Sequence, residues 1–534
     1  MVLKEHDLLQ IDSDYIRQLK EKDPDALADL SLRLVDDLKE AWDRMNQDSS
    51  NSSRPPGSEA PWITSPTEAD DDEVTGDDEE TPQPSSDEAG TDPDDESESV
   101  DSDATDPPSE SKRSAGRQPH SPGFGRTQCL PVTETIAHHC EHCVGCGHAF
   151  EPASQTAYTG FYSIDLLFGD NQSAGLQLTN TLHRYFRHTC SQCQLHNRTE
   201  PNRQPPEPID WDQVDLTEWR LVGPNLAAFI AYLCMDMRLT RRKVEVFLDD
   251  VLGLKLCIGT IQNSLIESAR ALSPVEDEIV RDVLSDALLH ADETSHKEAG
   301  ALLWLWVFVT TTTALFLVGK RCKEIWTNLV DSFEAGFQGW LMTDGYKVYR
   351  RYSRRLRCWA HLIRKAKGLA DSYDKQVRSN GKQLQRHLDT LMEAVYQARE
   401  GPDEGEQSIA IAHQDTVEKI RTLCTNMKSS THKKTRELGG EFLNDWEAIF
   451  RILDYPAWPL TNNEAERALR HWVILRKITQ GTRSEQGSRA LALFASVITT
   501  CRLRKASPLL FMRDVIQARR QGLAVPALPE IVSA

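Results

Sequence analysis

Apolar side chains recur at helical spacing over the first 45 residues of the chain. They occupy the positions Leu19, Leu27, Leu30, Leu34, Leu38 and Trp42. This spacing predicts an amphipathic helix, with Pro24 near the start of its main part. Such a helix either forms a short coiled coil that dimerises the protein or packs on its own chain. Too few heptads are present to separate these alternatives.

The pattern is also helical over residues 222–275, where we expect two consecutive helices. Thr240 is positioned to cap the first of them, Gly253 to end it, and the second would follow Gly259. The pair has the outline of a helix-turn-helix, but spacing alone does not define that geometry. A helical hairpin that packs on a neighbouring core is the favoured interpretation.

Residues 283–372 alternate between short apolar runs and helical stretches. The predicted elements are strands at 287–292, 302–310, 314–318 and 340–344, and helices at 324–337 and 358–371. The most apolar stretch contains four consecutive threonines in its middle, so two strands and a turn fit it better than a membrane helix. This order of elements predicts a mixed sheet flanked by helices.

Long helical patterns with few strand signals follow at 373–458, and residues 459–534 are basic and helical. We interpret the first segment as a helical insertion and the second as the completion of the core. By contrast, residues 46–126 are rich in Ser, Pro, Asp, Glu and Gly. They carry too few apolar residues to offset the entropy of ordering, so we expect a disordered linker there.

The net charge of −21 arises within this linker. Residues 59–110 contain 21 Asp or Glu and no Lys or Arg, and without them 61 acids face 61 bases. Net charge therefore does not exclude nucleic acid as a partner, because local patches decide that question. The acidic run either shields a basic channel in cis or serves as a solubilising linker, and the second interpretation is favoured.

Two Cys-x2-Cys pairs lie in the module at 127–205. Cys143, Cys146, Cys190 and Cys193 supply four thiolates, which suits a tetrahedral structural zinc. Candidates to replace one ligand are Cys140, His139, His142 and His188. The segment between the pairs is compatible with strands, so we predict a zinc-ribbon-like module that recognises DNA, although zinc ribbons also bind proteins. A set of free surface thiols is the alternative to a metal site. Clustered cysteines of this kind indicate a reducing compartment rather than a disulfide framework.

The chain is thus predicted to be a multidomain α+β protein with a mixed α/β core. Its parts are an N-terminal helix (1–45), a disordered acidic linker (46–126), a zinc-binding module (127–205), a helical region (222–275), the first part of the core (283–372), a helical insertion (373–458) and the completion of the core (459–534). The N-terminus lacks the apolar segment of a secretory signal. We therefore expect a cytoplasmic protein that does not associate with membranes.

Three carboxylates stand in distinctive local sequences. Asp292 and Asp344 each follow an apolar run, where a strand would deliver the side chain to the rim of a sheet. Glu466 opens a basic helix, with Glu464 as its rival, whereas Glu293 should point away from Asp292. Three convergent carboxylates can hold two magnesium ions, or manganese in their place. Two such ions support the cutting and rejoining of phosphodiesters.

Basic residues are dense around these acids. Residues 345–367 contain nine Lys or Arg and no acid, and residues 461–520 contain twelve bases against four acids. Aromatic residues are interleaved with the first patch, a combination that suits phosphates and unstacked bases, although a solvated helix face is the alternative. The candidate DNA-binding residues are Lys347, Arg350, Arg351, Arg354, Arg355, Arg467, Arg470, Arg476 and Lys477.

In several ordered blocks the chain resembles the IS66 family of bacterial insertion-sequence transposases. The blocks are Asn51-Ser-Ser-Arg54-Pro-Pro56, Cys143-Val-Gly-Cys146-Gly, His290-Ala-Asp292-Glu-Thr, Thr343-Asp344-Gly-Tyr346, Cys358-Trp-Ala-His361 and Asn462-Asn463-Glu-Ala-Glu466-Arg467. Their order and spacing make the resemblance specific. The chain departs from the family pattern in its longer acidic linker and at residues 118–123, where the usual Gly-His-x-Gly run is missing.

The resemblance implies a ribonuclease H-like core with a DDE triad of Asp292, Asp344 and Glu466. It implies that Asn463 and Arg467 flank the site and contact DNA or orient the glutamate, and that His361 lies near the metals or serves packing. It also implies an enzyme that binds terminal inverted repeats, cuts DNA with magnesium and transfers the strand to a target.

Partners implied by the resemblance are element-end and target DNA, a second copy of the chain in a dimer or larger oligomer, and accessory proteins of the same element. One alternative is a catalytically inactive, transposase-derived DNA-binding protein. The other is a two-metal nuclease of ribonuclease H-like fold. The triad counts against the first alternative, and the insertion and the cysteine module count against the second.

Overall fold

The computed structural model describes residues 11–45, 128–169, 175–200, 221–333, 336–400 and 408–531. The predictions for 46–126, which include the disordered linker and the Arg54-Pro-Pro56 motif, lie outside the described residues, as does the departure at 118–123. The chain divides into two compact units, one formed by residues 1–63 and 130–534 and the other by residues 64–129. All structure discussed below belongs to the first unit.

The N-terminal segment forms two helices, α2 (Ser13–Lys22) and α3 (Pro24–Met45). Asp23 separates them, and its Oδ1 accepts a hydrogen bond of 3.0 Å from the Ala26 amide in the first turn of α3. The predicted helix is therefore confirmed. Among the described residues of α3, Leu32, Leu38 and Trp42 are exposed, and the coiled-coil dimer stays a prediction.

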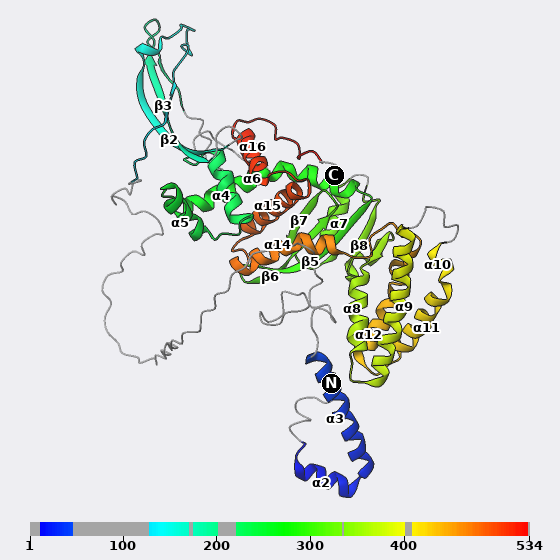
Figure 1. Ribbon diagram of the computed structural model, residues 1–534. Helices are drawn as coiled ribbons and strands as arrows, with labels where there is room; N and C mark the ends of the chain where they lie inside the picture. Colours follow the sequence, from blue (N-terminus) through cyan, green and yellow to red (C-terminus); the bar gives the residue numbers. More distant parts are fainter. Residues whose placement is uncertain are drawn as a thin grey trace, which may run out of the picture. The chain divides into compact units, whose positions relative to one another are not determined.

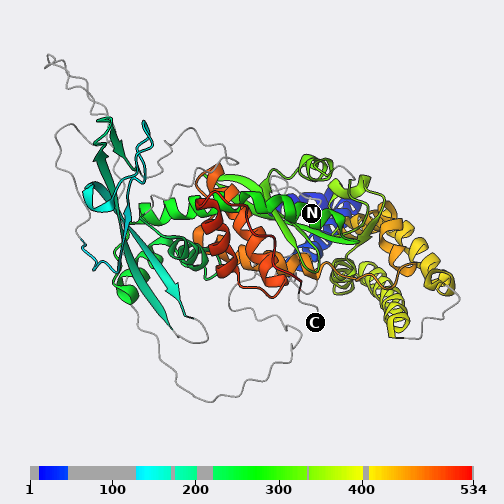
Figure 2. The ribbon, with the colours of Figure 1, turned by 90° about the horizontal axis from the view of Figure 1, so that it is seen from above.

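The cysteine-rich module is built on a long antiparallel hairpin, seen in cyan in Figures 1 and 2. Its elements are β1 (Glu134–His138), the 3-10 helix η2 (Pro152–Ser154), β2 (Thr156–Phe168), β3 (Leu176–Thr189) and β4 (His196–Arg198). Strand β3 pairs antiparallel with β2 and β4, and parallel with β1. Asp165 of β2 accepts a hydrogen bond of 2.7 Å from the Leu226 amide, which ties the hairpin to the first turn of α4 (Pro224–Met235).

The central sheet has five strands among the described residues, in the order β7-β6-β5-β8-β9. The strands are β5 (Leu288–Glu298), β6 (Ala301–Val309), β7 (Ala314–Gly319), β8 (Trp340–Thr343) and β9 (Arg355–Arg357). Strands β5, β6 and β7 form an antiparallel meander, whereas β8 and β9 run parallel to β5. Residues from Leu305 to Val309 are buried on both faces of β6, which explains their continuous apolar run.

Helices cover both faces of this sheet. The described helices of the core are α4, α5 (Arg241–Leu252), α6 (Ile258–Ser285), α7 (Lys323–Asp331), α14 (Asn463–Thr479), α15 (Glu485–Leu503) and α16 (Pro508–Arg520). On one face, Phe316 of β7 meets Trp472 of α14, and Figure 1 shows α14 and α15 lying across the strands. On the other face, Phe308 meets Trp326 of α7.

The helices predicted between 222 and 275 share one hydrophobic core with the sheet, as the favoured hairpin interpretation requires. Thr240 caps α5 by accepting a hydrogen bond from the Lys243 amide, and Gly253 ends it in the left-handed conformation. Helix α6 begins at Ile258, so Gly259 lies within it rather than before it. Among the described residues, no helix is both long enough and apolar enough to cross a membrane.

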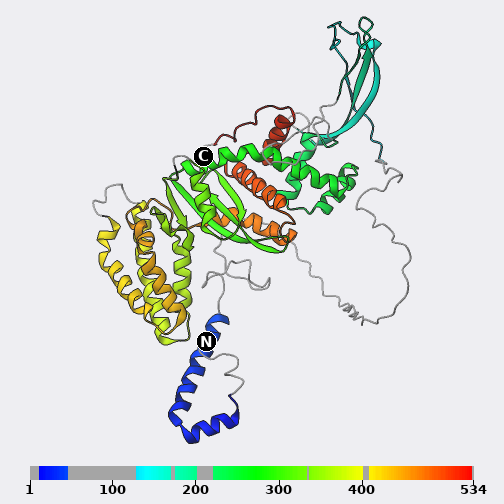
Figure 3. The same ribbon diagram turned by 180° about the vertical axis from the view of Figure 1, so that it is seen from behind.

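A second hydrophobic core joins the segment predicted as a helical insertion (373–458) to α8, which was predicted as part of the first core segment. Its elements are α8 (Trp359–Ala370), α9 (Lys375–Glu400), α10 (Ile409–Ala412), α11 (Gln414–Lys428), α12 (Lys433–Asn444), α13 (Trp446–Phe450) and the 3-10 helix η4 (Arg451–Leu453). Figure 3 shows α8, α9, α11 and α12, which are labelled in Figure 1, packed side by side in colours from yellow-green to amber. The helical character of this segment is confirmed, while the boundaries of the insertion stay a prediction.

Two further local predictions were wrong, and one strand was missed. Asp292 does not end a strand, because β5 continues to Glu298 in register with β6. The helix expected over 324–337 is shorter, since α7 ends at Asp331. Strand β9 was not foreseen, because its sequence Arg-Leu-Arg resembles a solvated basic patch, yet all three residues are buried.

Candidate active site

Asp292 lies in the middle of β5, opposite Val307 of β6. Its Oδ1 accepts a hydrogen bond of 2.8 Å from the Glu293 amide. Burial raises the pKa of the Asp292 carboxyl well above its usual range, and the charges of Asp344, Glu293 and Glu466 raise it further. The position therefore favours a neutral carboxyl unless a cation balances the negative charge.

Asp344 follows β8 directly and sits level with Asp292. Strands β5 and β8 are parallel, with His290 paired to Met342, so the same register taken two residues further sets Asp344 beside Asp292. The next residue, Gly345, has φ of +104°, and a Cβ there would overlap the guanidinium of Arg357. Only glycine permits the chain to turn here with Arg357 in place.

Glu466 lies in the first turn of α14. Its Oε1 is 3.7 Å from His361 Nδ1 and 3.8 Å from a nitrogen of Arg364, but this buried atom has no hydrogen-bond partner among the described residues. Burial raises the pKa of the Glu466 carboxyl, Arg364 lowers it and Asp344 raises it. Burial and Arg364 lower the pKa of His361 to about 4, so its ring is neutral at pH 7.

Asn462 connects the glutamate helix to the strand that carries Asp292. Its Oδ1 meets His290 Nδ1 at 3.0 Å, and its Nδ2 donates a hydrogen bond of 2.9 Å to the Ala291 carbonyl. The Glu466 amide donates in turn to the Asn462 carbonyl at 3.2 Å. Sequence reasoning assigned a role beside the site to Asn463, which is exposed, and missed the buried Asn462.

The arginines of β9 have partners of their own. Arg355 donates to Asp445 at 3.1 Å, and Arg357 also pairs with this carboxylate. Arg357 further donates to the Glu441 carboxylate at 2.6 Å and to the Asp344 carbonyl at 3.0 Å. Arg355 therefore does not belong to the predicted DNA-binding set, because its charge is buried and neutralised.

The other predicted DNA-binding residues lie at or near the surface. Those that are exposed are Lys347, Arg350, Arg351, Arg354, Arg467, Arg470 and Lys477. Arg476 is half-buried, and it donates to the Thr294 hydroxyl at 3.0 Å. Arg467 pairs with Glu464, the rival glutamate, at 3.3 Å.

Glu293 points to the opposite face of β5 from Asp292, as predicted. Arg321 donates to its Oε1 at 2.6 Å, and the Arg321 guanidinium lies 4.2 Å from the ring centroids of both Trp304 and Tyr346. Burial and the charge of Asp344 raise the pKa of Glu293 to about 7, while Arg321 opposes the shift. This buried acid beside the site was given no role in the sequence analysis.

The four predicted cysteines come together at one end of the hairpin module. The sulfur atoms of Cys143, Cys146, Cys190 and Cys193 all lie within 4.8 Å of one another. Gly147 and Gln194 adopt positive φ after the two knuckles, and their amides donate to the carbonyls of the first cysteine in each pair at 2.9 Å. The alternative ligand Cys140 lies outside this cluster, with its thiol directed to the Phe186 carbonyl.

A cation with tetrahedral coordination fits the sulfur cluster, and divalent cations that prefer oxygen ligands fit the carboxylates. The buried Glu466 oxygen has no hydrogen-bond partner among the described residues, and the acids around Asp292 repel one another. A bound cation would balance both. Among the described residues, however, only the cysteines bring three or more ligand atoms within 4.8 Å of one another. The oxygen atoms of the three carboxylates therefore do not all lie within this distance of one another.

The fold and the site define a class: a mixed α/β protein with neighbouring carboxylates on one sheet and a helical insertion between the second and third of them. Residues 220–490, about half of the chain, match the model described as the transposase IS66 family. The chain belongs to this family, which confirms the resemblance seen in the sequence.

Two relatives from Sinorhizobium fredii are also similar to this chain. The uncharacterized protein y4hP is 25% identical over 367 residues, which cover 61% of this chain and 63% of that protein. The uncharacterized protein y4qI is 27% identical over 283 residues, covering 47% and 51% respectively. The matched regions thus span less than two thirds of either relative.

Proposed function

We propose that this protein is a DNA transposase that cuts and joins strands through Asp292, Asp344 and Glu466. The proposal is supported mainly by the parallel pairing of β5 with β8, whose register extended two residues beyond its last pair brings two of these acids together, and by the effect of the Asp344 charge on the pKa of Asp292. Asn462 supports the third, because it holds the start of the Glu466 helix against β5. Membership of a transposase family by itself supports an enzyme that cuts DNA strands, without assigning the residues that do so.

The three carboxylates would hold two magnesium ions, with manganese as a substitute. Bound there, the ions would activate the attacking water or 3′-hydroxyl and stabilise the leaving oxygen. The protein supplies the negative ligands and holds them on two adjacent strands and one helix end. Asp292 is half-buried, and the partial removal of water around it would strengthen the attraction between the carboxylates and a cation.

The order and directions of the strands support the ribonuclease H-like assignment of the core. Three antiparallel strands are followed by two that run parallel to the first of them, and helices cover both faces. The boundaries of the two core segments and of the insertion between them are proposed together with this assignment. In this arrangement the helical insertion connects the sheet to the helix that carries Glu466.

The cysteine cluster would hold a structural zinc ion. Four sulfur ligands fill a tetrahedral shell, so the metal would stabilise the two knuckles and take no part in catalysis. We assign this module to the recognition of DNA, in particular the terminal inverted repeats of the element. Synapsis of two ends requires at least a dimer, and accessory proteins of the same element are the further partners proposed.

The deciding experiment is strand cleavage of a supercoiled plasmid that carries the DNA flanking this gene. Wild type and Asp292→Asn would be compared in magnesium and in EDTA, with the accessory proteins present. We expect magnesium-dependent cuts at the repeat ends in wild type, none in the variant, and equal DNA binding by both. A variant that still cuts would refute the triad. A wild type that binds without cutting would favour the inactive DNA-binding alternative.

A further inference from the structure

An open pocket of about 470 Å³ adjoins the candidate active site. One wall comes from the sheet side and includes Asp344 and Tyr346, and the other comes from helix α12 of the insertion. The lining residues are Arg321, Asp344, Gly345, Tyr346, Arg350, Lys365, Arg436, Glu437, Gly440, Glu441 and Asn444. Because Asp344 belongs to this lining, whatever occupies the pocket lies next to one of the three proposed catalytic residues.

The charge of the lining favours an anion. It includes four bases against three acids, and one of those acids, Asp344, is a proposed metal ligand. Arg436 donates from one nitrogen to the carbonyls of Ser430 and Thr431, and such bonds do not neutralise its charge. Arg350 is 41% exposed at its side chain, so it remains accessible although it lies 3.4 Å from Asp445.

The shape of the pocket favours a single small group. Its volume falls in the range of roughly 300–1,000 Å³ that small-molecule sites occupy. A Cβ built on Gly440 meets nothing within 4 Å, so this position of α12 leaves the helix backbone open to an occupant. Asn444 adds an amide that can donate to and accept from a base edge.

We propose that this pocket binds one nucleotide of the DNA strand next to the phosphate that is cut. Arg436 and Arg350 would contact its phosphate, while Tyr346 and Asn444 would contact its base. The proposal rests on the transposase function above, and it gives the helical insertion a direct part in holding the substrate. Arg350 is among the predicted DNA-binding residues, but neither that set nor the family match assigns a nucleotide site to this pocket or to α12.

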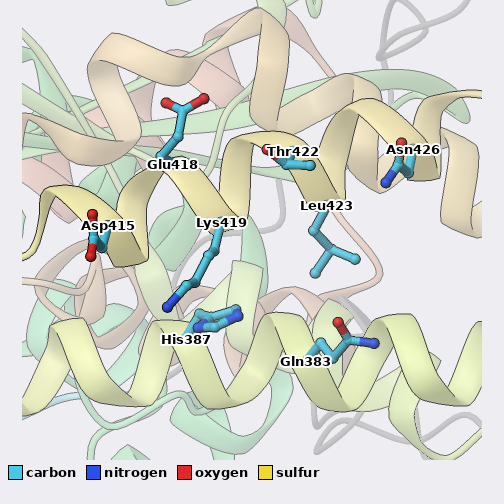
Figure 4. Close-up of a pocket in the computed structure, with 8 residues that line it drawn as sticks. All are labelled: Gln383, His387, Asp415, Glu418, Lys419, Thr422, Leu423 and Asn426. Carbon is cyan, nitrogen blue, oxygen red and sulfur yellow. The ribbon is translucent and has the colours of Figure 1, made fainter.

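Two substitutions test the proposal in the full-length protein. Gly440→Leu fills the pocket, and it should not unfold α12, because glycine is the poorer helix former by about 1 kcal/mol. Asn444→Leu removes the amide. Its matched control is Asn426→Leu on α11, which makes the same change at an exposed helical position in a different pocket of about 580 Å³, shown in Figure 4.

The probe is a duplex of the DNA flanking the gene, with one 4-thiothymidine placed at successive positions. Irradiation crosslinks this base to its nearest protein neighbour, and peptide mapping locates the crosslink. We expect one position beside the cut to crosslink to residues 433–444. In Gly440→Leu and Asn444→Leu, that crosslink should fall at least tenfold and cleavage at the same end should slow, whereas Asn426→Leu should match wild type.

An active wild type that gives no crosslink to α12 at any position would overturn the proposal. So would a Gly440→Leu variant that crosslinks and cuts like wild type. If the wild type binds but does not cut, the catalytic proposal fails separately. The crosslink map then still decides whether α12 meets a nucleotide, because crosslinking needs no magnesium and no catalysis.

Discussion

Replacement of Asn462 by alanine should disturb the arrangement of the active site, and therefore slow cleavage, while leaving the affinity for DNA nearly unchanged. The side chain of Asn462 is buried and makes two hydrogen bonds, one with the His290 ring and one with the Ala291 carbonyl. Both partners lie on β5, within two residues of Asp292. Alanine removes both bonds and leaves the helix that carries Glu466 without this attachment to the strand.

The expected loss of stability follows from the two groups that lose their hydrogen-bond partner, the His290 ring and the Ala291 carbonyl. A buried polar group left without a hydrogen bond costs about 1–3 kcal/mol, so Asn462→Ala should lower the free energy of unfolding by about 2–6 kcal/mol. The lower end applies if water enters the space. A displacement of about 1 Å between Glu466 and the aspartates would slow strand cleavage by about 100-fold.

The assay combines urea unfolding with cleavage measured below the onset of unfolding. The adjacent Asn463→Ala is the control, because Asn463 is exposed and its loss should change stability by less than about 0.5 kcal/mol. We expect Asn462→Ala to require more magnesium for half-maximal cleavage while its affinity for DNA stays within twofold of wild type. Equal stability and equal cleavage in the two variants would refute the reasoning.

Three further predictions concern buried charge, the sulfur cluster and thiol reactivity. Asp445→Ala removes the carboxylate that pairs with buried Arg355 and leaves buried Arg357 with Glu441 alone, so it should cost about 3–5 kcal/mol in urea unfolding, and a loss below 1 kcal/mol would contradict the pairing. Cys143→Ser should reduce the bound zinc measured by atomic absorption, whereas unchanged zinc content would reject the cluster as its site. A hydrogen bond from Thr260 lowers the pKa of the exposed Cys257, while burial raises that of Cys501 to about 12. Near pH 7 iodoacetamide should therefore alkylate Cys257 well before Cys501, and equal rates in the folded protein would contradict this order.

The sequence pattern predicted the strands and helices of the core better than the placement of its acids. Asp344 was predicted at the end of a strand because the apolar run Trp340-Leu-Met-Thr343 stops there, and β8 does end at Thr343. The same reasoning failed at Asp292, where polar residues continue the strand to Glu298. A polar stretch continues a strand when a neighbouring strand pairs with it, and β6 does so through Ala301.

Burial of charge was the main feature that the sequence could not reveal. Arg355 and Arg357 look like part of an exposed basic patch, because their partner Asp445 lies about 90 residues away in the chain. Similarly, Asn462 and Asn463 are chemically identical neighbours, and only the direction of α14 decides which of them faces β5. Such distinctions depend on tertiary contacts that local patterns do not encode.

The buried arginine Arg357 makes the insertion part of the active-site structure. It donates to the Asp344 carbonyl, and it is held by Glu441 and Asp445, which belong to α12 and the residue after it. A guanidinium buried this completely requires both acids, and the absence of a side chain at Gly345 gives it room beside the turn. The position of Asp344 therefore depends on carboxylates from the insertion, so loss of either acid should disturb cleavage as well as the packing of the helices.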